Sequence, residues 1–317
     1  MNWSLKSSFY IIVVSVLLFY SNCRQEQTYQ QLTQEESVAS LIEVEDLQNR
    51  LPAESDLIVI DVRPLEEYSQ GHIPQAFQVW RPQIQSQDYP YGGMMASRQN
   101  IEDLLGSMGA TPSHGIVLYD NNGCVDAARL WWILSYYGHK NTALLNGGLT
   151  AWEQAGHGIT GEEPLREPRN YSFSRSPGNN SMAATLEDVS NGLNDPYTVL
   201  LDTRTFEEYA GTSLKKGASR SGRIPGSIWA DWVLSIDYGA SNKFKNKEEL
   251  RAIYEAKGVT ANHTVVAYCH SGVRSAHTTF VLTELLGYPN VLNYDGSWTE
   301  WSYHSELPIE SDTVDIM

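Results

Sequence analysis

From residue 41 onward the chain alternates short, continuously apolar runs with longer segments in which apolar and polar residues are mixed. A strand without polar alternation is typical of a sheet that is covered on both faces. Strands that alternate with helices predict an α/β fold with parallel-type sheets and right-handed crossovers. In the first half the patterns predict strands at 57–63, 115–119 and 143–145, and helices at 44–50, 97–108 with Ser97 as a plausible N-cap, 125–137 and 148–154.

The same order of elements returns in the second half, which indicates an internal duplication. The register becomes constant at 149 residues, as the following pairs illustrate: Asp120 and Cys269, Gly123 and Gly272, Gly138 and Gly287, and Trp152 and Trp301. The length of 317 residues also suits two domains. We predict domains at 41–156 and 182–317, joined at 157–181 by a linker rich in Pro, Gly, Ser, Asn and Arg.

The first 40 residues have the pattern of a targeting signal followed by a flexible tether rather than of a folded domain. An apolar run of 12 residues at 9–20 precedes Cys23; it is short for a bilayer span and suits a secretory signal. The pattern resembles a bacterial lipoprotein signal, so we expect a signal peptide at 1–22, lipidation of Cys23 and a flexible tether at 23–40. The protein would then be exported and lipid-anchored in the cell envelope or periplasm. Plain secretion and an uncleaved anchor are the alternatives.

The composition describes an acidic, globular protein. Hydrophobic residues make up 41% of the chain, and the net charge of −16 argues against nucleic-acid binding, which requires clustered Lys and Arg. Cys23 is assigned to export, and Cys124 and Cys269 fall in equivalent loops of different domains, so we expect no structural disulfide. Cys124 is predicted to be a small packing residue rather than a second nucleophile.

The stretch 265–286 holds the candidate active site. It predicts a strand that ends at Cys269, a polar loop with Gly272, and a helix from Arg274 to 286. Such a loop directs free backbone N–H groups toward one point, and the helix dipole adds positive potential, so the loop can hold an anion. These N–H groups and Arg274 would lower the pKa of the Cys269 thiol. A cysteine at a strand end is often only a packing residue, but the polar residues that follow favour an anion-binding nest.

This loop resembles the active-site loop of rhodaneses, the thiosulfate and 3-mercaptopyruvate sulfurtransferases. Cys269 and Arg274 are separated by four residues, whereas protein tyrosine phosphatases and arsenate reductases have five there, and the tighter ring suits a single sulfur. The resemblance extends from about 41 to 310 and implies two tandem rhodanese-like domains, each a mainly parallel sheet flanked by helices. Its motifs are Leu118-Tyr119-Asp120, Ala127-Ala128-Arg129-Leu130-Trp131-Trp132, Tyr137-Gly138-His139 and Leu145-Asn146-Gly147-Gly148 in the first half, and Asp202-Thr203-Arg204, Arg223-Ile224-Pro225-Gly226-Ser227, Tyr268-Cys269 and residues 293–301 in the second.

The resemblance implies a sulfurtransferase that works by double displacement. Cys269 would take the outer sulfur of a small-molecule donor as a persulfide, and a thiophilic acceptor, cyanide or a thiol, would remove it. Asp120 replaces the cysteine in the first half, and a carboxylate cannot carry a sulfane sulfur, so that domain should be silent. No metal or organic cofactor is implied, and no His/Cys spacing for zinc is present in the sequence. The residues implied to bind donor or persulfide are His270, Ser271, Gly272, Val273, Arg274 and Ser275.

The loop combines features of two donor classes. His270 and Arg274 favour thiosulfate, whereas Ser271, Gly272 and Val273 match the mercaptopyruvate pattern. We predict a thiosulfate sulfurtransferase, with 3-mercaptopyruvate as the alternative donor.

Two arginines outside the loop are further candidates for substrate binding. Mercaptopyruvate enzymes grip the substrate carboxylate with arginines; Glu208 stands where one is expected, and Arg220 is a candidate substitute. Arg204 is the other candidate, although a local salt bridge with Asp202 is the favoured interpretation. His72 is expected to be a turn residue, and packing roles are expected for His277, Trp298 and Trp301.

Functions of other classes stay open. The fold could serve as a binding or anion-sensing module without turnover, but the second half keeps the cysteine and loop that a decayed module should lose. Dephosphorylation or oxyanion reduction is disfavoured by the short loop.

Overall fold

The computed structural model describes residues 39–51, 56–174 and 182–312. The predicted signal peptide and nearly all of the predicted tether, including Cys23, lie outside the described residues. Among the residues that are described, no helix combines the length and the apolar character needed to cross a membrane.

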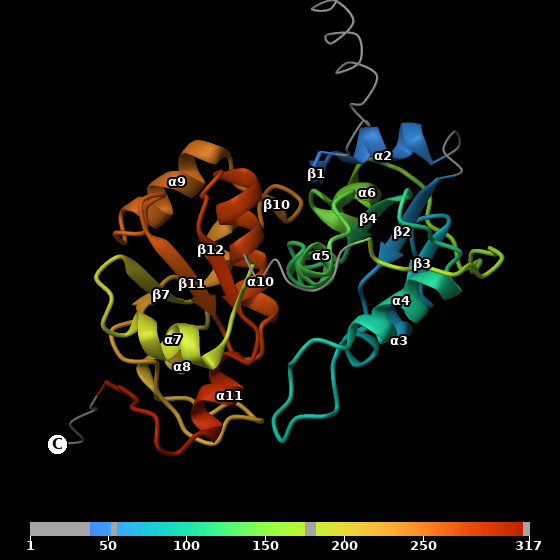
Figure 1. Ribbon diagram of the computed structural model, residues 1–317. Coiled ribbons are helices and arrows are strands. Elements are labelled where there is room, and N and C mark those ends of the chain that lie inside the picture. The colour runs from blue at the N-terminus through green and yellow to red at the C-terminus, as the bar shows by residue number, and fades with distance from the viewer. Residues whose placement is uncertain (1–38, 52–55, 175–181, 313–317) are drawn as a thin grey trace, which may run out of the picture. The chain divides into compact units, whose positions relative to one another are not determined.

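The first repeat is built on a five-stranded parallel sheet in the order β1-β5-β4-β2-β3 (Figure 1). The central strands β2 and β4 are buried along their whole length, in agreement with their continuous apolar sequences. The elements are β1 (Leu41–Ile42), α2 (Val44–Arg50), β2 (Leu57–Asp61), α3 (Leu65–Tyr68), β3 (Ala76–Gln78), the 3-10 helix η1 (Arg81–Ile84), α4 (Arg98–Ser107), β4 (Gly115–Tyr119), α5 (Val125–Tyr137), β5 (Thr142–Leu145) and α6 (Gly148–Gln154).

The second repeat has the same topology, with a parallel sheet in the order β6-β12-β11-β7-β8. A short antiparallel pair, β9 and β10, lies outside this sheet. The elements are β6 (Ala183–Ala184), α7 (Leu186–Gly192), β7 (Thr198–Asp202), α8 (Phe206–Ala210), β8 (Ile228–Trp229), the 3-10 helix η2 (Trp232–Ser235), β9 (Ile236–Asp237), β10 (Lys243–Phe244), α9 (Lys247–Glu255), β11 (Thr264–Tyr268), α10 (Val273–Phe280), the π-helical turn η3 (Val281–Leu285), β12 (Val291–Tyr294) and α11 (Ser297–Tyr303). The predicted class, two mainly parallel sheets flanked by helices, is confirmed.

Alternate residues of β2 pack against different helices. Ile58 and Ile60 belong to the apolar cluster that contains Leu130 of α5, whereas Val59 belongs to the cluster that contains Leu47 of α2. Because successive strand residues point to opposite faces, both faces of this sheet are covered, which is why its strands show no polar alternation.

Helices α5 and α10 join the two repeats into one core. The Trp131 ring of α5 meets the Phe280 ring of α10 edge to face, with 4.9 Å between centroids. Since α10 begins directly after the loop that follows Cys269, this packing brings the first repeat against the candidate site.

Two helices begin at or within one residue of their predicted starts. Ser97 caps α4 as predicted, since its hydroxyl accepts a hydrogen bond from the Asn100 N–H at 3.3 Å. The helix predicted from Arg274 begins one residue earlier, at Val273, and ends in a π-helical turn. The Thr279 hydroxyl donates to the carbonyl of Ser275, four residues back, and such hydroxyls compete with the regular backbone ladder.

The predicted linker runs along the first repeat through its described part. Tyr171 and Phe173 are buried, and the Phe173 ring lies 5.4 Å from that of Tyr137 in α5. The Arg169 N–H donates to the carbonyl of Gly106 in α4 at 2.9 Å. Part of the segment therefore contributes to the core of the first repeat.

Candidate active site

Cys269 follows β11 and opens the loop into α10, and only 1% of its surface is exposed. Gly272 caps the helix with a φ of +75°, and a Cβ on it would lie 2.7 Å from the Asp295 carbonyl oxygen. The Ser297 hydroxyl accepts from the Cys269 N–H at 3.1 Å and from the Gly272 N–H at 3.0 Å, and donates to the Tyr294 carbonyl at 2.7 Å. One buried hydroxyl thus fixes both ends of the loop.

The environment of Cys269 favours the thiolate. Burial raises the pKa of the thiol, but the Arg274 charge, the Ser275 hydroxyl and the backbone N–H groups of Ser275 and Ser271 outweigh it, and the pKa is lowered from its ordinary value. The Ser275 hydroxyl donates to the sulfur at 3.5 Å. A thiolate that N–H groups hold can act as a nucleophile near neutral pH.

Arg274 is paired with Glu208 of α8. Two guanidinium nitrogens donate to the two carboxylate oxygens at 2.6 and 2.9 Å. Burial alone would raise the pKa of Glu208, but the hydrogen bonds and charge of Arg274 lower it to about 2. The carboxylate therefore stays ionised and compensates much of the Arg274 charge.

His270 is neutral at physiological pH. Burial and the Lys215 charge lower the pKa of its ring to about 4. Its Nε2 lies 3.0 Å from the Lys216 carbonyl oxygen, which can only accept, so Nε2 carries the proton. His270 thus anchors the 215–217 segment and adds no positive charge to the loop.

Lys215 was not among the site residues predicted from the sequence. Burial and the Arg274 charge lower its pKa, and it also interacts electrostatically with Cys269 and Glu208. The available signal was the basic pair of Lys215 and Lys216 after α8, which no local pattern connects to a cysteine more than 50 residues away.

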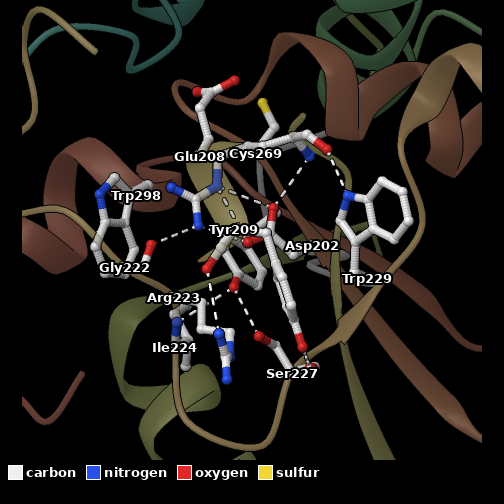
Figure 2. A network of polar contacts seen from close by, with 12 residues as sticks. Asp202, Glu208, Tyr209, Gly222, Arg223, Ile224, Ser227, Trp229, Cys269 and Trp298 are labelled. Carbon is white, nitrogen blue, oxygen red and sulfur yellow. Dashed lines mark hydrogen bonds and ion pairs between the residues drawn. The ribbon is translucent and has the colours of Figure 1, made fainter. Parts of the chain in front are cut away.

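Arg204 is buried among residues of the polar network in Figure 2, which include Asp202, Gly222 and Trp298. It pairs with Asp202 at 2.6 Å, donates to the Gly222 carbonyl at 2.8 Å and is stacked over the Trp298 ring at 4.7 Å. The predicted local salt bridge with Asp202 is confirmed. In Figure 2 the Glu208 carboxyl and the Cys269 thiol both appear at the upper side of this network.

Arg220 binds the end of α11. Its guanidinium donates to four backbone carbonyls, which belong to Trp301, Ser302, His304 and Leu307. Such bonds satisfy the free carbonyls of a helix C-terminus. A substrate-binding role for Arg220 stays a prediction, and it would require some of these bonds to break.

The corresponding loop of the first repeat holds its own anion. Asp120 is 1% exposed, and its carboxylate accepts four backbone N–H groups, from the following residues: Asn122 at 2.8 Å, Cys124 at 2.9 Å, Asp126 at 2.8 Å and Ala127 at 3.1 Å. Burial and the Asp126 charge raise the pKa of Asp120 to about 6 despite these bonds. The cradle that a sulfur anion would need is filled by a side chain of the loop itself.

Four other residues have structural environments, as predicted. Cys124 is fully buried, with its sulfur 3.1 Å from the Leu145 carbonyl oxygen, and burial raises its pKa. His72 is buried and stacked on Tyr68. Trp298 and Trp301 belong to the apolar cluster on one face of the second sheet.

Comparisons with known proteins agree with this architecture. A family model described as the rhodanese-like domain matches residues 43–155 and 185–304. A thiosulfate sulfurtransferase of Pseudomonas aeruginosa is 32% identical over 85% of this chain and 96% of that protein. The sulfur carrier protein TtuD of Thermus thermophilus is 34% identical over 76% of this chain and 86% of that protein.

A solved structure of the anaerobic ergothioneine biosynthesis enzyme from Chlorobium limicola superposes with a TM-score of 0.77 at 23% identity, covering 86% of this chain and 70% of that one. At this identity the likeness concerns the fold alone. The family model and the two relatives span most of both repeats. The chain therefore belongs to the rhodanese family, and its relatives group it with the sulfurtransferases.

Proposed function

We propose that this protein transfers a sulfane sulfur from thiosulfate, through a persulfide on Cys269, to a thiophilic acceptor such as cyanide or a thiol. The observation that carries the proposal is a buried thiol at the start of a loop, bound by the Ser275 hydroxyl and by the N–H groups of Ser275 and Ser271, with a lowered pKa. This arrangement suits both a nucleophile and a negatively charged adduct.

The two steps balance without a redox partner. The Cys269 thiolate attacks the outer sulfur of thiosulfate, a sulfur–sulfur bond forms to the cysteine, and sulfite leaves with the electron pair of the bond that breaks. Cyanide then attacks the outer sulfur of the persulfide, and thiocyanate leaves as the Cys269 thiolate is regenerated. An anionic adduct is present between the steps, which is the species that backbone N–H groups stabilise.

Thiosulfate is favoured as the donor because it is a dianion and the loop is flanked by Arg274 and Lys215. A relative that is matched over 96% of its own length carries the name thiosulfate sulfurtransferase. The alternative donor, 3-mercaptopyruvate, is supported by Ser271, Gly272 and Val273, which match that pattern in the loop. His270 does not distinguish the donors through its charge, since its ring is neutral.

Steady-state kinetics with both donors and cyanide tests the proposal. Cys269→Ser should abolish thiocyanate formation, whereas Cys124→Ser, a matched change at the other buried thiol, should retain it. The specificity constant for thiosulfate should exceed that for 3-mercaptopyruvate. The reverse order would favour the alternative donor, and absence of turnover with either would favour a binding or anion-sensing module.

We also propose that the protein is exported and held in the cell envelope or periplasm by a lipid on Cys23. The support is the sequence alone, an apolar run at 9–20 followed by a cysteine. Labelling cells with a fatty acid should tag the wild type and leave Cys23→Ala untagged. Label on both proteins or on neither would contradict the anchor.

A further inference from the structure

Each loop has its glycine carbonyl bound by a side chain of the opposite repeat. In the first repeat, the Gly123 carbonyl lies 3.0 Å from Nε2 of His277, which belongs to α10. In the second, the Gly272 carbonyl accepts from Arg129 of α5 at 3.3 Å. Gly123 and Gly272 occupy the same position of the 149-residue repeat. Helix α10 of the second repeat therefore contacts the loop of the first repeat, and helix α5 of the first repeat contacts the loop of the second.

The orientation of this carbonyl determines where the next N–H points. In a planar trans peptide the C=O and the following N–H point in opposite directions. In the first repeat His277 binds the Gly123 carbonyl, and on the other side the Cys124 N–H donates to the Asp120 carboxylate at 2.9 Å. The anion of the first loop thus lies opposite the side chain that binds the glycine carbonyl.

The second repeat has the same arrangement around Cys269. The Gly272 carbonyl accepts from Arg129 and, at 3.3 Å, from the Asn293 amide. The Val273 N–H, equivalent to that of Cys124, is then directed to the side of the loop where the sulfur lies. The thiolate itself is stabilised by the N–H groups of Ser275 and Ser271, so the Val273 N–H is suited to a second sulfur.

Arg129 is held rigidly in this position. Its side chain is 1% exposed, it forms an ion pair with Asp295 at 2.6 Å, and it donates to the Gly93 carbonyl at 2.8 Å. Gly93 leaves no space beside the loop, since a Cβ there would lie 2.5 Å from the Ser271 Cβ. Buried arginine that is bound on several sides loses little entropy when it orients a peptide.

We propose that Arg129, from the catalytically silent repeat, is a positioning residue for sulfur transfer: it fixes the peptide between Gly272 and Val273 so that the Val273 N–H stabilises the outer sulfur of the persulfide. This inference rests on the proposed persulfide function. The first repeat would then take part in the reaction through Arg129, although its own loop is occupied by the Asp120 carboxylate.

The test is the equilibrium between persulfide and free thiolate. Purified protein is incubated with defined ratios of thiosulfate to sulfite, and the fraction of persulfide is read from the intact mass. Arg129→Met should shift the equilibrium about tenfold toward the free thiolate, as expected for a weakened hydrogen bond to an anion. The pKa of the thiol, measured from the pH dependence of alkylation by iodoacetamide, should change little. Arg129→Lys should return the equilibrium part of the way to the wild-type value.

Arg63→Met is the matched control, because Arg63 is a buried arginine of the same repeat that pairs with Asp61 at 2.6 Å. It should lower the thermal midpoint and leave the persulfide equilibrium unchanged. The double variant Arg129→Met/Asp295→Asn avoids an unpaired buried carboxylate if the single variant does not fold. Equal shifts for Arg63→Met and the Arg129 variants, or no shift for the latter, would overturn the inference. Absence of persulfide in the wild type would instead refute the proposed function.

Discussion

Glu208 and Arg274 form a two-point ion pair beside the loop that follows Cys269, with nitrogen to oxygen distances of 2.6 and 2.9 Å. The pair affects both the thiol and an anionic donor. Arg274 lowers the pKa of Cys269, yet the carboxylate compensates much of the positive charge that an anionic donor would meet. Glu208 therefore orients Arg274 but also weakens the attraction of Arg274 for thiosulfate.

Glu208→Gln should improve the use of an anionic donor. The amide can still accept from one Arg274 nitrogen, while the negative charge beside Arg274 is removed. We expect KM for thiosulfate to fall roughly fivefold, which corresponds to about 1 kcal/mol of charge interaction in a solvated site. Steady-state kinetics at constant ionic strength would measure this change in KM. A higher KM would mean that the orientation of Arg274 matters more than its free charge.

The reactivity of Cys269 should follow a thiol pKa below the ordinary value of about 8.5. Because the reactive form is the thiolate, the alkylation rate should be fully developed above this pKa and should decrease as pH falls through it. Arg274→Gln should move the midpoint to higher pH, since the Arg274 charge is the largest influence that lowers this pKa. In Arg274→Gln the Glu208 carboxylate loses its partner, and the double variant Glu208→Gln/Arg274→Gln controls for that unpaired charge. An unmoved midpoint in both variants would contradict the role of Arg274.

His270 should not titrate between pH 5.5 and 8. Burial lowers the pKa of its ring to about 4. The pH profile of activity should therefore show no change near pH 6.5 that depends on His270, and the profiles of wild type and His270→Gln should agree there. Because glutamine can also donate to the Lys216 carbonyl and no charge is lost, kcat/KM for thiosulfate should stay within about twofold. A step near 6.5 in the wild type alone would show that the imidazolium takes part.

Lys215 should assist the capture of thiosulfate. Lys215→Gln should raise KM severalfold with little change in kcat, and added salt should reduce the difference between wild type and variant. The neighbouring Lys216→Gln is the matched control, because it removes the same charge and leaves the carbonyl that binds His270. Equal effects of the two changes would indicate general attraction by surface charge.

The sequence predicted the parts of this structure that leave a local or periodic pattern. The buried strands are continuous apolar runs, the duplication has a fixed register, and the loop after Cys269 is contiguous. The pairing of Arg274 with Glu208 joins residues 66 positions apart, and Arg129 reaches Gly272 across 143 positions. Those contacts depend on how the sheets and the two repeats pack, which neither residue type nor spacing determines.

The position of Lys215 illustrates the same limit. Its sequence neighbourhood is a polar segment after a short helix, and the contact of His270 with the Lys216 carbonyl holds that segment near the loop. In contrast, the sequence placed His270 among the residues that favour thiosulfate, but burial lowers the pKa of its ring, so it adds no positive charge to the loop. Burial is a property of the folded chain and cannot be read from one residue.

The most direct test of the account is the intact mass of the protein after incubation with thiosulfate and removal of excess donor. We predict a gain of about 32 daltons, the mass of one sulfur atom, on the peptide that contains Cys269, and its loss on addition of cyanide with release of thiocyanate. Cys124→Ser should gain the same mass and Cys269→Ser none. A wild-type mass that does not change, or an adduct that persists in Cys269→Ser, would contradict persulfide formation on Cys269.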